Sequence, residues 1–184
     1  MPPGYRVALG GQIEGERATV RQLASVGGFA LLLVLTVLAG QFKRLRVAML
    51  VLVTVPVAIV GALGALIVTA TPLNASSLMG CVLLVGLVVK NGVLLLEEAE
   101  KLAEAEGAER AVVLAGDRRV RPVLMTTLAT LAGLFPLALG IGAGAELQRP
   151  LAITVIGGLL TSTIATLVFL PPLAAVVLRQ KTAK

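Results

Sequence analysis

Five long apolar runs, separated by short polar segments, constrain the fold of this chain more than any other feature. A helix that crosses a bilayer needs about 20 mostly apolar residues. Runs of that length cover residues 23–42, 47–69, 77–96, 122–140 and 150–172. Only 14% of the residues are charged, whereas about a quarter are charged in a typical soluble domain. The sequence therefore predicts an all-α integral membrane protein, with a five-helix transmembrane bundle over residues 23–184.

The first 22 residues are more polar and follow a different pattern. Tyr5, Val7 and Leu9 alternate with other residue types before a Gly–Gly pair, which is typical of a short strand that ends in a turn. An isolated strand has no neighbour to pair its backbone hydrogen bonds. We therefore interpret residues 1–22 as a β-prone stub that belongs to a larger domain.

The basic residues are distributed unequally between the two sides that the five runs define. On one side, the loop at 41–46 carries three, the segment 97–121 carries five and the tail from Arg179 carries three. The opposite side carries four in all, namely Arg6, Arg17, Arg21 and Arg149. Loops rich in Lys and Arg stay in the cytoplasm. We therefore expect the N-terminus to lie outside and the C-terminus inside.

The charged segment 97–119 is expected to form a cytoplasmic helix that lies near the membrane surface. It contains two pairs of opposite charge four residues apart, Glu97–Lys101 and Glu106–Arg110, and such pairs stabilise a helix. Good helix formers make up most of the segment, and Gly107 interrupts them.

The residue types exclude several classes of function. The chain has no His and no Trp, and Cys81 is its one cysteine, so neither an imidazole metal site nor a cysteine pair is expected within it. No cofactor is implied, and the absence of a nucleophile–base pair gives an enzyme no support. The basic residues lack interleaved aromatic residues, so they do not indicate a nucleic-acid partner.

Lys90 and Asn91 place an ammonium and an amide side by side inside the third apolar run. Lys90 precedes Glu97 by two helical turns, which puts it about 10 Å below the cytoplasmic edge. A lysine at the centre of a spanning helix costs roughly 2.5–3.5 kcal/mol on insertion, and such residues are usually functional or paired. The alternative is snorkelling, in which the side chain stretches toward the headgroups. Because an amide gains nothing from snorkelling, Asn91 favours a functional site.

No acidic residue lies inside the five apolar runs as delimited above, so none is available to neutralise Lys90 at its own depth. A buried ammonium without a partner either loses its proton or pairs with an acid elsewhere. We therefore expect that acid to come from another polypeptide or from a further part of this one.

A second polar pair accompanies the fourth run. Arg119 and Thr126 are seven residues apart, hence on one face of a helix, and Thr126 falls at about the depth estimated for Lys90. A hydroxyl at that depth is able to bind water or relay a proton beside a charged group. The alternative is that Thr126 and Thr127 bond back to carbonyls of their own helix.

Five stretches of the sequence resemble the C-terminal part of a resistance–nodulation–cell division (RND) efflux permease. They are PPGYRVALGGQIEGERA at 2–18, KNGVLLLEEAE at 90–100, RRVRPVLMTTLA at 118–129, GAGAELQRPLA at 142–152 and VIGGLLTSTIATLVFLPPL at 155–173. The resemblance runs in order over essentially all 184 residues. GAELQRPLA and GGQIE are similar to the heavy-metal branch, whereas KNG and the long apolar runs fit the multidrug branch nearly as well.

The resemblance implies about spans 8–12 of twelve, which is half of a permease membrane domain, with residues 1–22 as the remnant of a periplasmic porter domain. It also implies a proton-driven substrate/proton antiporter in the inner membrane of Gram-negative bacteria, with the N-terminus periplasmic and the C-terminus cytoplasmic. The family is usually trimeric and works with a periplasmic adaptor and an outer-membrane channel. A lysine at the place of Lys90 pairs there with acids on the fourth span, and Asn91, Arg119 and Thr126 match the same proton relay.

Two functions of different classes are therefore expected. The first is the C-terminal module of a proton-driven exporter, which is not competent alone and needs the N-terminal half of the permease or a full-length homologue as its partner in the bilayer. The alternative is a small membrane interaction protein that associates with a full-length permease and modulates it.

Overall fold

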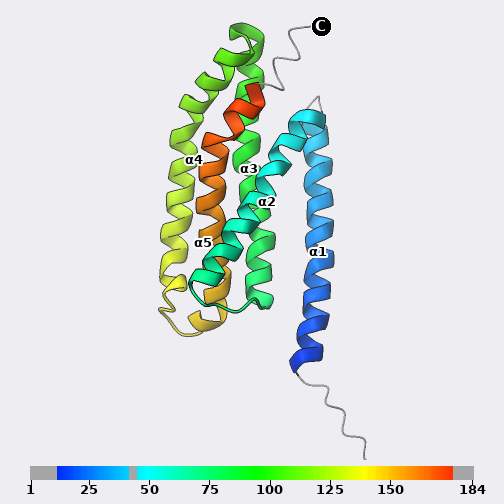
Figure 1. Cartoon of the computed structure of the whole chain (residues 1–184), viewed down its shortest axis with the longest axis vertical. Coiled ribbons are helices and arrows are strands. Elements are labelled where there is room, and N and C mark those ends of the chain that lie inside the picture. Colours follow the sequence, from blue (N-terminus) through cyan, green and yellow to red (C-terminus); the bar gives the residue numbers. More distant parts are fainter. Residues whose placement is uncertain (1–11, 42–44, 176–184) are drawn as a thin grey trace, which may run out of the picture.

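Five long helices form a bundle in the computed structural model, which describes residues 12–41 and 45–175 (Figure 1). The helices are α1 (Gln12–Gln41), α2 (Leu45–Val68), α3 (Ala75–Glu106), α4 (Ala108–Ala138) and α5 (Ala145–Val168). Each contains a stretch long and apolar enough to cross a membrane. The prediction of an all-α bundle with five apolar helices is therefore confirmed for the described residues. The strand expected over residues 5–9 lies outside them.

The first helix begins earlier than the sequence pattern indicated. Residues 12–22, which we assigned to the N-terminal stub, are helical and continue directly into the apolar part of α1. Gln, Glu, Arg and Ala dominate this stretch, and all four are good helix formers. Because polar residues extend a helix as well as apolar ones do, the apolar run marks only the part suited to lipid. The assignment of residues 1–22 to a porter domain stays a prediction.

The segment 97–119 is not a separate helix, which differs from our expectation. Its first residues complete α3, which has 32 residues, and its last residues begin α4, which has 31. The single residue between the two helices is Gly107, with a φ of 80°. Residues with a side chain rarely adopt a positive φ, whereas glycine does so readily. Gly107 therefore reverses the chain in one step and makes α3 and α4 a hairpin.

The other turns carry their own local signals. Asn74 and Ser77 form a capping box at the start of α3, in which Asn74 Oδ1 accepts a hydrogen bond from the Ser77 backbone at 3.0 Å and Ser77 Oγ accepts one from the Asn74 backbone at 2.9 Å. After α5 the chain turns at Phe169, and residues 170–175 are again helical. Pro171 and Pro172 lack the backbone N–H that would continue the α5 ladder, so the last span ends earlier than residue 172.

α5 lies at the centre of the bundle and contacts α2, α3 and α4. Glycines on α5 and α2 allow the two backbones to approach closely. A Cβ added at Gly157 would overlap the Cβ of Ala65 and come within 2.9 Å of the Gly61 carbonyl oxygen. At Gly158 it would overlap the Leu84 side chain of α3. Small residues on facing helices allow close packing in lipid, which provides no hydrophobic driving force between helices.

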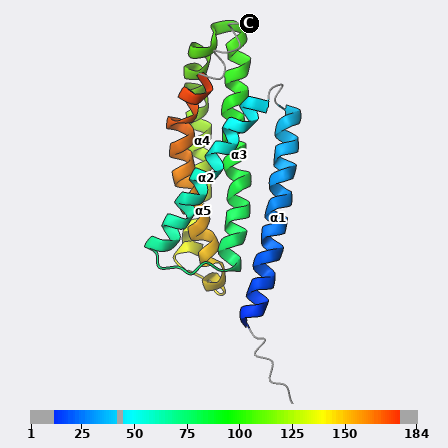
Figure 2. The same cartoon turned by 45° about the vertical axis from the view of Figure 1, so that its right-hand side comes forward.

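α1 stands at the edge of the bundle (Figure 2). It contacts α3 and, more sparsely, α2, and Leu38 is the one residue of α1 that is buried among those whose burial the structure describes. Large apolar side chains such as Phe29 and Val37 are exposed along it. One face of α1 is therefore left uncovered by the described helices, and so is the side of α3 that carries Met79 and Leu83, which are 53% and 48% exposed.

We predict that Gly157→Ala destabilises the bundle, whereas Gly64→Ala does not. Both changes replace a helical glycine and gain helix propensity, but a Cβ at Gly64 meets no atom within 4 Å. The forced shift at Gly157 is expected to lower the free energy of unfolding by about 1–3 kcal/mol. Thermal unfolding of the purified chain in detergent measures both variants. Equal midpoints for the two variants would contradict the close approach of α2 and α5.

Candidate functional site

Lys90 lies on the uncovered face of α3 and is exposed within this chain. It helps to line a groove of about 440 Å³ between α1 and α3. The α1 wall consists of Leu and Val side chains, and the charged residues of the groove are Lys90 and Glu97, both on α3. In the part of the chain that the structure describes, no ion pair joins Lys90 to an acidic side chain.

On its other side, Lys90 lines a smaller and more polar cavity of about 60 Å³ between α3, α4 and α5. Its lining residues are Leu87, Lys90, Asn91, Thr126, Thr127, Thr130 and Leu159. Asn91 is only 7% exposed. The structure thus brings three of the four residues singled out from the sequence, Lys90, Asn91 and Thr126, to one cavity. Their role in a proton relay stays a prediction.

Threonine hydroxyls provide most of the polar lining of this cavity, and they are bonded in two different ways. Thr126 Oγ1 donates to the Val123 carbonyl oxygen of its own helix at 3.0 Å. This bond is the alternative to a relay role that the sequence left open. Thr127 does not bond back: its hydroxyl lies 3.2 Å from that of Thr163 on α5. Sequence spacing did not indicate Thr163, because its partner is 36 residues away on another helix.

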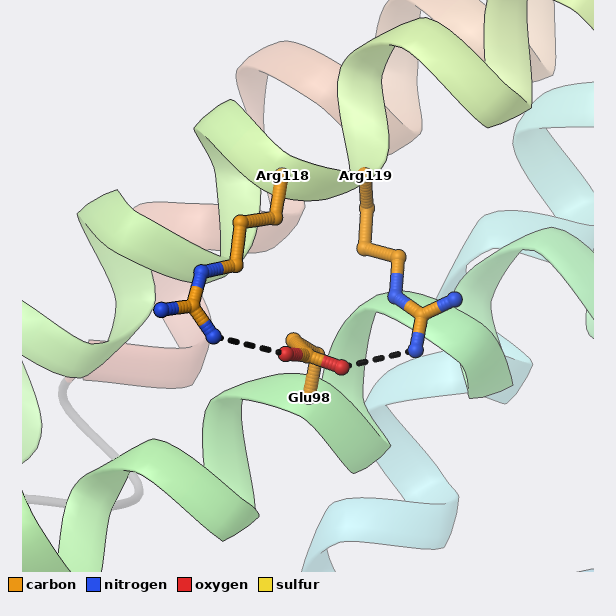
Figure 3. Close-up of polar contacts among 3 residues, drawn as sticks. All are labelled: Glu98, Arg118 and Arg119. Carbon is orange, nitrogen blue, oxygen red and sulfur yellow. Dashed lines mark hydrogen bonds and ion pairs between the residues drawn. The ribbon is translucent and has the colours of Figure 1, made fainter.

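Arg119 does not line the cavity and is engaged elsewhere (Figure 3). Its Nη2 atom lies 2.7 Å from Glu98 Oε2 on α3, and Arg118 Nη1 lies 3.3 Å from the other carboxylate oxygen. The Glu98 side chain is 17% exposed and that of Arg119 is 27% exposed, whereas that of Arg118 is 58% exposed. One carboxylate therefore ties α3 to α4 through two guanidinium groups, and the Arg119 pair is the less solvated of the two.

We predict that Glu98→Gln and Arg119→Gln each lower the stability of the α3–α4 hairpin by about 1 kcal/mol, and that Arg118→Gln has a smaller effect. Exposed ion pairs contribute about 0.2–1 kcal/mol because water screens them, and the Arg119 pair is the less exposed one. A double-mutant cycle on thermal unfolding in detergent gives the coupling energy of each pair. A larger coupling for Arg118 than for Arg119 would contradict the geometry.

In the described ranges, no group of three or more His, Cys, Asp or Glu side chains is placed to hold a metal ion. The features that stand out are five apolar helices and a lysine and an amide at membrane depth beside a hydroxyl-lined cavity. Intramembrane ionisable residues mark transport pathways and proton relays in multi-pass proteins. This arrangement is that of a multi-pass membrane protein of the transporter class.

Comparison with known proteins identifies the family. The family model described as the AcrB/AcrD/AcrF family matches residues 1–178. The chain therefore belongs to this family of RND efflux permeases. It is 36% identical over 184 residues to the nickel and cobalt resistance protein CnrA of Cupriavidus metallidurans, covering all of this chain and 17% of CnrA. It is 46% identical over 123 residues to the multidrug resistance protein MdtC of Erwinia tasmaniensis, covering 66% of this chain and 12% of MdtC.

A solved structure supports the same assignment. The chain matches the crystal structure of a heavy metal efflux pump, crystal form II, with a TM-score of 0.80 and 40% sequence identity. The match covers 91% of this chain and 16% of the pump. The chain thus spans about a sixth of the length of CnrA and of this pump. The recognition of an RND permease segment, in its heavy-metal or multidrug branch, is confirmed.

Proposed function

We propose that this chain supplies the C-terminal spans of a proton-driven RND exporter and that Lys90 responds to the protonation of an acid on another span. The observation that carries the proposal is the position of Lys90 on the uncovered face of α3, between an apolar groove and a hydroxyl-lined cavity. An ammonium in that setting needs a negative partner. A further apolar helix of the permease that carries an acid at the depth of Lys90 fits the uncovered face.

The groove on one side of Lys90 and the cavity on the other suggest two positions for its ammonium, one for each protonation state of the acid. While the acid is ionised, the ammonium pairs with it. When the acid takes up a proton from the periplasmic side, the pair is lost, and the ammonium turns to the oxygen atoms of Asn91, Thr126 and Thr127. Release of the proton toward the cytoplasm restores the pair. Each cycle then moves one proton inward per acid, and the side chain of Lys90 moves with it.

Arg119 has a different place in this proposal. Its relay assignment rests on the resemblance to the family, while its contact is with Glu98. We propose that it acts from the cytoplasmic end of α3 and α4, where protons would leave. The setting is that of the family: the inner membrane, a trimer, and assembly with a periplasmic adaptor and an outer-membrane channel. The substrate is a metal cation or a drug, the two classes named for its relatives CnrA and MdtC.

We predict that Lys90→Met and Lys90→Arg abolish export. Met leaves the acid without a counter-charge, so that the acid keeps its proton. Arg stays charged, but its planar guanidinium is larger than an ammonium and is not interchangeable with Lys at a site of fixed geometry. The measurement is nickel resistance conferred by a CnrA chimera in which this chain replaces the matched region, with equal amounts in the membrane. Resistance should fall to that of cells without the chimera.

Lys101→Met is the matched control, because Lys101 is an exposed lysine further along the same helix. It should leave nickel resistance unchanged. The chain expressed without the rest of CnrA should confer no resistance, since no acid in the described part of the chain pairs with Lys90. If Lys90→Met keeps full resistance in the chimera, the relay is rejected and the lysine is an anchor at the interface.

We predict that the ends of α1 and α2 near Gln41 face the cytoplasm and that the loop before α3 faces the periplasm. The asymmetry of basic residues between the two ends is the basis. In a background without Cys81, a Cys at Leu73 should react with a membrane-impermeant maleimide added to intact spheroplasts. A Cys at Gln41 should react only after permeabilisation. Labelling of the Gln41 site alone in intact spheroplasts would reverse the orientation.

A further inference from the structure

Two buried threonines connect α4 and α5 at the small cavity beside Lys90. Thr127 is 4% exposed and Thr163 is 5% exposed, and their hydroxyl oxygens lie 3.2 Å apart. Thr127 itself lines the cavity, together with Lys90 and Asn91. Within the described residues, no other hydrogen bond joins a side chain of α4 to a side chain of α5. It lies where the proposed relay would operate.

The direction of this hydrogen bond follows from the neighbouring one. Thr163 Oγ1 donates its proton to the Leu159 carbonyl oxygen of its own helix at 2.6 Å. A hydroxyl has a single proton to donate, so Thr163 accepts from Thr127. The proton of Thr127 is therefore directed at Thr163, and Thr127 has only acceptor capacity left for the cavity.

Thr127 and Lys90 line the same cavity. Five of its seven lining residues are polar, and its volume of about 60 Å³ exceeds the roughly 10–15 Å³ that one water requires. The donors among the lining side chains include the Lys90 ammonium and the Asn91 amide. The Thr127 oxygen is an acceptor in the same cavity as these donors.

We propose that Thr127 and Thr163 are positioning residues of the Lys90 site: the chain Thr127–Thr163–Leu159 carbonyl holds the Thr127 oxygen as an acceptor for the Lys90 ammonium, directly or through one water, in the state without an ionised acid. This inference rests on the proposed function and adds to it the hydrogen bonds that hold the Thr127 oxygen in place. Thr163 acts through Thr127, since it does not line the cavity.

The groups that face Lys90 from α1, α4 and α5 are not titratable. The groove residues of α1 are Leu and Val, and those of the smaller cavity on α4 and α5 are threonines and Leu159. Among the described residues that line either cavity, Glu97 is the one other titratable group, and it lies on α3 two turns from Lys90. A change in pH dependence on substitution of Thr163 therefore reports on the equilibrium between the two positions of the Lys90 ammonium, beside the acid and beside Thr127.

The test uses the CnrA chimera, purified into proteoliposomes, and measures proton-driven nickel transport as a function of pH. Thr163→Val and Thr127→Val keep the volume of the side chain and remove the hydroxyl. Each should lower the transport rate about three- to tenfold, as expected for the loss of one ordinary hydrogen bond. Each should also move the pH profile toward lower pH, because loss of the acceptor disfavours the state in which the acid is protonated and the ammonium has left it. Protonation of the acid then needs a higher proton concentration. The double variant should transport no more slowly than the slower single variant.

Two further variants separate positioning from packing. Thr163→Ser keeps the hydroxyl and should restore both the rate and the pH profile. Thr154→Val is the matched control: Thr154 is also buried on α5 and donates to a carbonyl four residues earlier, that of Pro150 at 2.7 Å, but it does not line the cavity. It should leave the pH profile unchanged.

The outcomes distinguish this inference from the proposed function. If Lys90→Met abolishes transport while Thr163→Val behaves like Thr154→Val, the relay stands and the positioning role of Thr163 is rejected. A Thr163→Ser variant as slow as Thr163→Val would also reject it, because the hydroxyl would then not be the cause. If Lys90→Met transports normally, the proposed function itself has failed.

Discussion

The close approach of the α2 and α5 backbones at Gly61 and Gly157 is the contact on which the rest of the bundle depends. In hydrocarbon, helices associate through packing and hydrogen bonds rather than through exclusion of water. α5 is in contact with α2, α3 and α4, so its depth in the bundle sets where its other faces lie. Leu159 and Thr163 follow Gly157 within two turns on the same helix. The contact between Gly157 and α2 therefore fixes the position of Leu159 in the wall of the polar cavity. It also fixes Thr163, which forms the hydrogen bond to Thr127 on α4.

The number and type of the helices could be read from the sequence, but their ends could not. Twenty consecutive apolar residues leave little alternative to a spanning helix. The residues that continue α1 and α3 beyond the apolar runs are ordinary helix formers, and hydropathy does not distinguish a helix that continues from one that stops. Segment 97–119 contains two glycines, Gly107 and Gly116, and only Gly107 has a positive φ and divides the segment between two helices. Which of the two does so depends on how α3 and α4 pack.

The candidate site was predictable to the extent that it depends on depth along a helix. Counting residues from a charged end gives Lys90 and Thr126 similar depths, and the structure places both at one cavity. What counting does not give is the rotation of each helix and the choice of partners across helices. Arg119 shares a helical face with Thr126 by spacing, but the carboxylate of Glu98 on α3 binds it. The contribution of α5 had no local signal at all.

The hairpin of α3 and α4 has a mechanical consequence. A helix of 32 residues is about 48 Å long, whereas the hydrocarbon layer is about 30 Å thick, so the tip at Gly107 projects well beyond the lipid. Because one residue joins the helices and Glu98 clamps both arginines, the projecting part behaves as a stiff rod rather than as a loop. A small tilt of α3 at the level of Lys90 would displace the tip at Gly107 by a larger distance, and α4 would move with it.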